Sequence, residues 1–340
     1  MQPDGGAGSV SIPERPNDDQ AVVGQCGLRS IVGESPVRHH GSRLRASGAL
    51  LVIGCAVAGL LAVPSTAQAA STPPTYYVSL GDSYSVGYQP GLGATPGYTA
   101  FVAQKTHFTL ANFGCGGATT TSLLSTIGCP DKLPHTAGAV PYPTTTQAAA
   151  AEAFLGAHRG HIGLIGLITV SIGGNDVTSC AANANPISCV AGAVTTISRN
   201  VSTLATALRA AAGPRVPLIG LTYPDVILGT YVYPTQPPTA SRISLAKLSV
   251  VAFRSLINPT LTKAYGSAGG VLVDVTAATG AYASLARTVR LRPYGTIPVP
   301  VASVCALTWF CSQGNIHATT KGYTLIGRLA VAKFVAMRRA

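Results

Sequence analysis

Five short apolar runs, each about the length of one buried strand, alternate along this chain with stretches long enough to form helices. The apolar runs cover residues 76–80, 110–113, 164–171, 216–222 and 270–275. Helical length and spacing occur at 186–212, 240–265 and 319–338. Strands that alternate with helices predict a parallel sheet covered on both faces. We therefore expect an α/β fold, with its site in the loops beyond the carboxyl ends of the strands.

The first 69 residues of the 340-residue chain differ from the rest and are typical of an export signal. Basic residues precede an apolar run at 49–63, and Ala67-Gln68-Ala69 is a small-x-small cleavage sequence. The run is shorter than the roughly twenty residues that cross a bilayer. We therefore expect an N-terminal extension and signal peptide over 1–69, cleavage near Ala69, and one secreted domain over 70–340. The alternative is a lipid anchor at Cys55, because 52–55 resembles a bacterial lipobox.

Basic residues outnumber acidic ones in the predicted mature chain. The leader holds equal numbers of both, so removing it leaves the net charge at +12. Such an excess favours anionic surfaces such as phospholipid headgroups or acidic wall polymers, and the competing interpretation is a generally basic solvated surface. Nucleic acid is not expected as a partner, because no basic cluster is interleaved with aromatic residues. With 47% hydrophobic and 10% charged residues, the composition predicts a globular protein with a buried core.

Six cysteines remain in the predicted mature chain, and an even number in an exported protein predicts disulfides. Many connectivities are open to six cysteines. Because the residues form three couples of sequence neighbours, we expect the pairs Cys115 with Cys129, Cys180 with Cys189, and Cys305 with Cys311. No C-x-x-C pair suggests zinc, and we expect neither a metal nor another cofactor.

The apolar run at 76–80 leads directly into Gly81-Asp82-Ser83. Glycine permits a sharp turn at a strand end, after which a serine hydroxyl can be exposed and its backbone N–H can face a substrate. Ser83 is therefore a candidate nucleophile. By itself the tripeptide is typical of an ordinary turn in which Asp82 or Ser83 caps a helix.

Two glycine-rich segments, 114–117 and 173–175, also follow apolar runs directly. Backbone N–H groups near Gly117 can approach an oxyanion closely, and the Asn175 amide is a neutral donor that can serve without titrating. A phosphate-binding loop would need a lysine that is missing after Ala118. Each segment alone is typical of a flexible turn or a strand-end turn.

The fourth segment, 314–323, carries His317 just ahead of the last predicted helix. A single histidine is usually a surface or hydrogen-bonded structural residue. His317 becomes a candidate catalytic residue only because the other three segments occur in the same chain.

Taken in order, the four segments resemble the SGNH or GDSL hydrolase superfamily, named after a serine, a glycine, an asparagine and a histidine in separate blocks. The resemblance covers about residues 75–338, and the size, export signal and six cysteines are similar to those of secreted actinobacterial lipases and esterases. It implies a three-layer α/β/α sandwich with a central parallel, flavodoxin-like sheet. Ser83 would be the nucleophile and His317 the general base and then acid. The N–H groups of Ser83 and Gly117 and the Asn175 side chain would form the oxyanion hole.

One position departs from the superfamily pattern, which places an aspartate three residues before the histidine. Gly314 stands there instead. Some members of this group use a main-chain carbonyl, so we expect the Gly314 carbonyl to orient the His317 ring. A distant aspartate, Asp225 or Asp274, is the lesser possibility.

The predicted function is hydrolysis of carboxylic esters with apolar acyl groups by a secreted monomer, with a small-molecule or lipid ester as substrate. A carbohydrate acetylesterase of the same fold is the alternative within the enzyme class. The alternative from another class is a non-catalytic module that binds wall polymer or lipid.

Overall fold

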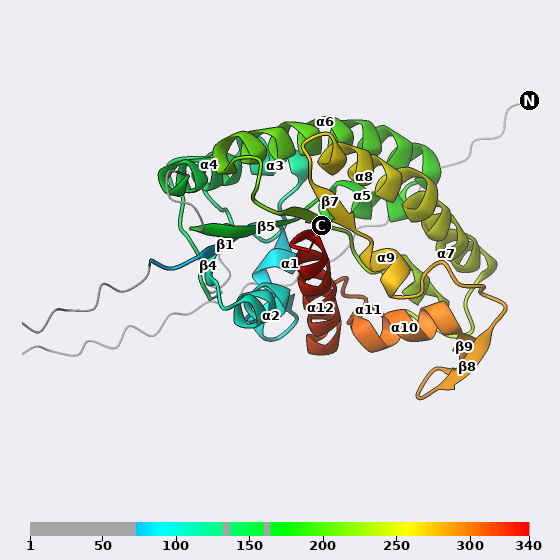
Figure 1. Cartoon of the computed structure of the whole chain (residues 1–340). Coiled ribbons are helices and arrows are strands. Elements are labelled where there is room, and N and C mark those ends of the chain that lie inside the picture. Colours follow the sequence, from blue (N-terminus) through cyan, green and yellow to red (C-terminus); the bar gives the residue numbers. More distant parts are fainter. Residues whose placement is uncertain (1–72, 132–136, 160–163, 340) are drawn as a thin grey trace, which may run out of the picture. The chain divides into compact units, whose positions relative to one another are not determined.

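The computed structural model describes residues 73–131, 137–159 and 164–339, and a parallel sheet of five strands lies at its centre (Figure 1). The strand order is β4-β1-β5-β6-β7, and every neighbouring pair is parallel. The strands are β1 Tyr76–Gly81, β4 Thr109–Asn112, β5 Ile165–Ser171, β6 Leu218–Leu221 and β7 Val271–Val273. All five strands predicted from the apolar runs are therefore confirmed. The predicted leader, with Ala69 and Cys55, lies outside the described residues.

Helices cover both faces of this sheet (Figure 1). One layer consists of α3 Thr120–Ser125, α4 Gln147–His158, α6 Pro186–Ala212 and α8 Asn258–Gly266. The other contains α2 Gly97–Thr106 and α12 Thr320–Met337, which pack against each other. The predicted three-layer α/β/α class is confirmed. In the described part of the chain, no helix combines the length and apolar character needed to cross a bilayer.

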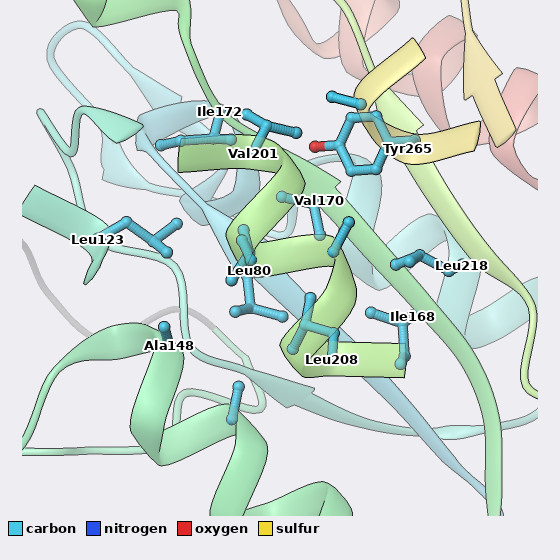
Figure 2. Close-up of a cluster of buried hydrophobic side chains, with 14 of the residues drawn as sticks. Leu80, Leu123, Ala148, Ile168, Val170, Ile172, Val201, Leu208, Leu218 and Tyr265 are labelled. Carbon is cyan, nitrogen blue, oxygen red and sulfur yellow. The ribbon is translucent and has the colours of Figure 1, made fainter. Parts of the chain in front are cut away.

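Successive residues of a strand point to opposite faces, so the central strands contribute to two hydrophobic cores. On β5, Ile168 and Val170 belong to the core shared with α6, whereas Leu167 belongs to the core shared with α12. Figure 2 shows the first core, in which side chains of the sheet meet Leu208 of α6 and Ala148 of α4. The buried sheet therefore holds the ends of its strands in fixed positions, from which the site loops emerge.

Helix α6 has the bounds that the sequence predicts. The Asn185 side chain accepts a hydrogen bond from Ser188 N and caps the first turn. Ile197, Val201, Leu204 and Leu208 are buried at spacings of three and four residues, which places them on one face toward the sheet.

A third cluster of buried residues lies outside the sheet, around Leu228, Val232, Ile297 and Val301. Its elements are η2 Val226–Tyr231, α7 Ala240–Ala252, the antiparallel hairpin β8 Thr288–Leu291 with β9 Gly295–Pro298, and α10 Val299–Leu307. The shorter elements of the chain are α1 Ser83–Val86, β2 Tyr88–Gln89, β3 Gly93–Ala94, α5 Gly174–Thr178, η1 Ser179–Ala182, α9 Val275–Ala278 and α11 Phe310–Gln313.

The helix predicted over 240–265 is not a continuous α-helix. Helix α7 is followed by a π-helical turn, η3 Phe253–Ile257, and then by α8. Pro259, in the first turn of α8, has no N–H to bond a carbonyl in the preceding turn, and the wider turn lies directly before it. The sequence prediction of one helix is therefore wrong at this point.

The three cysteine pairs expected from the sequence are confirmed. Disulfides join Cys115 to Cys129, Cys180 to Cys189, and Cys305 to Cys311. Each closes a local loop, so their main effect is to fix the geometry of the segments that follow β4, β5 and α10.

Candidate active site

Ser83 stands at the point where β1 turns into helix α1. Gly81 has a φ of +139°, and a side-chain carbon there would lie 2.1 Å from the Ser171 carbonyl oxygen, so this turn requires glycine. The Asp82 carboxylate then accepts a hydrogen bond from Tyr84 N at 2.9 Å and caps α1. The turn thus places Ser83 as the first residue of a helix at the carboxyl end of β1.

The ring of His317 lies against the Ser83 hydroxyl, with 2.8 Å between Nε2 and Oγ. His317 belongs to the loop before α12, more than two hundred residues away in sequence. Trp309 N donates to the His317 carbonyl at 2.9 Å, and the disulfide between Cys305 and Cys311 closes the preceding turn. These contacts hold the loop that presents the ring.

The other ring nitrogen of His317 contacts a side chain that the sequence analysis did not identify. Asn315 Oδ1 lies 2.7 Å from Nδ1 and also accepts from the backbone N of His317 at 3.1 Å. An amide oxygen only accepts, so Nδ1 carries the proton and Nε2 offers its lone pair to the Ser83 hydroxyl. The expectation for the Gly314 carbonyl is corrected: Gly314 ends α11 in the left-handed conformation, and the side chain of the next residue orients the ring.

Neither aspartate named as a lesser possibility contacts His317. Asp225 is buried and accepts from Ser249 Oγ at 2.8 Å, whereas Asp274 caps α9 and accepts from Asn258. No carboxylate of the described residues bonds the ring, and burial lowers the pKa of His317 to about 4. The ring is therefore neutral at pH 7 and able to accept a proton.

Two tyrosines enclose the ring of His317. Tyr88 packs edge-on at 4.4 Å between ring centroids, and Tyr84 lies nearly parallel to it at 6.0 Å. The Tyr84 hydroxyl donates to the carbonyl of Ile316 at 2.7 Å, which ties the histidine loop to the helix that bears Ser83. This bond joins two segments that are far apart in sequence.

The two glycine-rich segments meet beside Ser83. Asn175 Nδ2 donates one hydrogen to the Ala118 carbonyl at 2.9 Å, and its second hydrogen has no acceptor in the described part of the chain. Gly117, directly before Ala118, has a φ of +72°, and its N–H likewise bonds no described residue. The Ser83 N–H begins α1, a position without an intrahelical acceptor. The three predicted oxyanion donors therefore retain free hydrogens.

Hydrogen bonds of Asp176 link the two glycine-rich segments. Its carboxylate accepts from Thr120 N at 2.9 Å and from Thr120 Oγ1 at 2.6 Å, at the start of α3. The bonds join the residue after Asn175 to the turn that contains Gly117. Charge-assisted bonds of this kind are the stronger ones in proteins.

We expect Asp176→Ala to lower kcat for a soluble ester by about fivefold to tenfold with little change in KM, because both bonds from Thr120 that join the loops are lost. Steady-state kinetics with circular dichroism as a fold check measures this effect. Glu152→Ala, which removes a carboxylate from α4, is the matched control. Equal kcat values for both variants would show that Asp176 has no positioning role.

A second buried carboxylate supports the turn of Ser83. Asp82 is 2% exposed, and its Oδ2 accepts from the Tyr223 hydroxyl at 2.5 Å. Burial raises the pKa of Asp82 to about 7, while its hydrogen bonds to Tyr223 and Tyr84 oppose this rise. A capping role for Asp82 is expected from its place before a helix, whereas no sequence pattern points to Tyr223.

An apolar pocket begins at Ser83 and Asn175. It runs between the start of α6, helix α7 and the π-helical turn. The side chains that give it its apolar character include Ile187, Val190, Leu245, Leu248, Phe253 and Ile257. Such a pocket accepts a hydrocarbon group at a short distance from the serine hydroxyl.

The amino-acid sequence from residue 79 to residue 325 matches the GDSL-like Lipase/Acylhydrolase family. A search among curated proteins gave no match. Similar solved structures include a phospholipase A1 from Streptomyces albidoflavus NA297, with 20% identity, 76% of this chain and 98% of that chain covered, and a TM-score of 0.43. Another, described as a lipolytic protein of the G-D-S-L family from Desulfitobacterium hafniense DCB-2, has 13% identity, coverages of 76% and 98%, and a TM-score of 0.36.

Proposed function

This chain belongs to the GDSL-like lipase/acylhydrolase family, and on that premise we propose that it is a secreted serine esterase or lipase in which Ser83 carries the acyl group. The family membership supports ester hydrolysis in general. The observation that supports this particular assignment is the contact between Ser83 Oγ and His317 Nε2 beside an apolar pocket whose wall includes Ser83.

In the acylation step, Ser83 Oγ attacks the ester carbonyl carbon while His317 Nε2 takes the hydroxyl proton. The carbonyl oxygen becomes negative and accepts hydrogen bonds from the N–H groups of Ser83 and Gly117 and from Asn175 Nδ2. As the tetrahedral intermediate collapses, the bond to the alcohol oxygen breaks. The alcohol leaves with the proton from Nε2, and the acyl group remains on Oγ.

In the deacylation step, water attacks the acyl carbon and gives its proton to Nε2. The second intermediate collapses to the carboxylic acid, and the proton returns to Ser83 Oγ. The Asn315 side chain holds the ring in the tautomer that both steps need. An amide oxygen stabilises the imidazolium less than a carboxylate does, so a larger share of the transition-state stabilisation falls to the three oxyanion donors.

The pocket supports an apolar acyl group as the part of the substrate that is recognised. Its walls are mostly hydrocarbon and can contact the aliphatic chain attached to the acyl carbon. They contain few polar groups that could bind sugar hydroxyls. This favours an esterase or lipase over a carbohydrate acetylesterase. The three disulfides support a site of action in an oxidising compartment outside the cytoplasm.

We expect kcat/KM for p-nitrophenyl esters to rise at least about tenfold from acetate to hexanoate, since each buried methylene contributes about 0.8 kcal/mol. Ala252→Leu, which fills part of the pocket wall, should remove most of this rise and leave the acetate rate nearly unchanged. Initial rates over the series measure both effects. A steep loss of rate beyond acetate would favour the acetylesterase, and no hydrolysis of any ester by folded protein would favour the binding module.

A further inference from the structure

Helix α7 exposes large apolar side chains to solvent. Val251 is 51% exposed and Leu248 is 36% exposed, although most apolar residues of this size are buried in the fold. Lys247 is exposed beside them, one helical turn before Val251. These three residues, which we call the α7 face, form a contiguous surface because residues three and four apart are neighbours on a helix.

The α7 face is continuous with the apolar pocket. Leu248 belongs to both, since it is part of the pocket wall together with Leu245 and Ala252. One side of α7 therefore forms the wall of the pocket, and the adjoining side is apolar and open to solvent. The exposed apolar side chains of α7 therefore adjoin the wall of the pocket that also contains Ser83.

The charged residues within the segment that carries the α7 face are all basic. From residue 240 to residue 266 the chain contains Arg242, Lys247, Arg254 and Lys263 and no acidic residue. Lys247 bonds no carboxylate among the described residues, and the exposed Arg254 lies over the ring of Tyr282. A second copy of this chain would bring like charges together, whereas an anionic surface would be attracted.

Apolar side chains flanked by lysine and arginine are the composition that binds the interface of a membrane with anionic lipids. We propose that the α7 face docks on an anionic phospholipid surface, with Val251 and Leu248 among the acyl chains and Lys247 and Arg254 at the headgroups. Docking in this way would place the pocket mouth at the lipid, so that an acyl chain enters past Leu248. That last step rests on the proposed function, whereas the docking itself does not require Ser83 chemistry.

The test uses the full chain in a Ser83→Ala background, so that lipid is not consumed, and measures co-sedimentation with vesicles of phosphatidylcholine alone or mixed with phosphatidylglycerol. Lys247→Gln combined with Val251→Asn removes one charge and one exposed apolar group from the α7 face. The matched control is Arg328→Gln combined with Val335→Asn on α12, in the other helical layer, where Val335 is 40% exposed.

We expect the α7 variant to bind the mixed vesicles at least about tenfold more weakly, and the α12 control to bind like the parent. Binding should be much weaker to phosphatidylcholine alone and should fall as salt is added. Equal losses in both variants, or no loss in either, would overturn the proposal. Binding of the parent to a soluble anionic polymer without vesicles, weakened equally in both variants, would also overturn the proposal, because it would assign the binding to general charge.

Failure of docking is distinguishable from failure of the proposed function. With Ser83 restored, Lys247→Gln combined with Val251→Asn should keep the rate on soluble p-nitrophenyl butyrate, because neither residue is part of the pocket or contacts Ser83 or His317. Loss of that rate together with unchanged vesicle binding would place the two residues in the ester site and contradict the docking role.

Discussion

Ser83→Ala should lower kcat/KM for a soluble ester by at least about 10⁴-fold and abolish covalent labelling by a fluorophosphonate. Removing the nucleophile leaves only the oxyanion donors and substrate binding, which together retain a small part of the catalysis in serine hydrolases. Intact mass spectrometry after labelling, with kinetics on the same preparation, measures both effects. The matched control is Ser179→Ala, an exposed serine near the pocket in η1, which should label and turn over like the parent.

His317→Ala should give a loss of similar size, and the double variant should be no worse than the more damaged single one. This non-additivity is expected because the two groups act as one unit through the contact between Oγ and Nε2. Folding is checked by thermal unfolding, since a change at the Ser83 turn could also disturb the buried Asp82. Stoichiometric labelling of Ser83→Ala would show that another residue is the nucleophile.

The sheet could be predicted from the sequence because its strands are buried on both faces and so read as continuous apolar runs. Helix α6 could be predicted because its apolar residues repeat at helical spacing and Asn185 and Pro186 mark its start. Helix α4 was missed because half of its residues are alanine, which gives little contrast between buried and exposed faces. The π-helical turn was missed because the apolar pattern continues through Pro259.

Some residues of the candidate site can be predicted from the sequence and others cannot. Ser83, Gly117 and Asn175 follow strands of one parallel sheet, whose carboxyl ends meet at one edge, so their proximity follows from the fold class. The bond from Tyr223 to Asp82 joins residues 141 positions apart and depends on side-chain packing that no local pattern encodes. Asn315 could not be predicted for a different reason: the superfamily pattern places the orienting residue three positions before the histidine, where Gly314 stands, whereas the acceptor lies only two positions before it.

Asn315→Ala should lower kcat by about 10²-fold with KM little changed, because the ring of His317 loses the acceptor that fixes its tautomer. The backbone N–H of His317 loses its partner in the same substitution. Asn183 offers a matched control, since its Oδ1 accepts from the backbone N two residues later in the same kind of turn and lies far from His317 in sequence. Asn183→Ala should leave kcat unchanged, and a comparable loss in both variants would argue for a merely structural role.

Asn315→Asp separates orientation from charge. The carboxylate keeps both acceptor bonds, so activity at pH 7 should be retained, and its negative charge should raise the pKa of His317 from the value of about 4 that burial imposes. Only the neutral ring accepts the Ser83 proton, so kcat/KM falls as pH drops through the pKa of the ring. The acidic limb of the rate profile should therefore begin near pH 4 to 5 in the parent and at least about one pH unit higher in Asn315→Asp. Coincident limbs, measured between pH 3.5 and 9 on protein that remains folded, would mean that the side chain at position 315 does not control the charge state of His317.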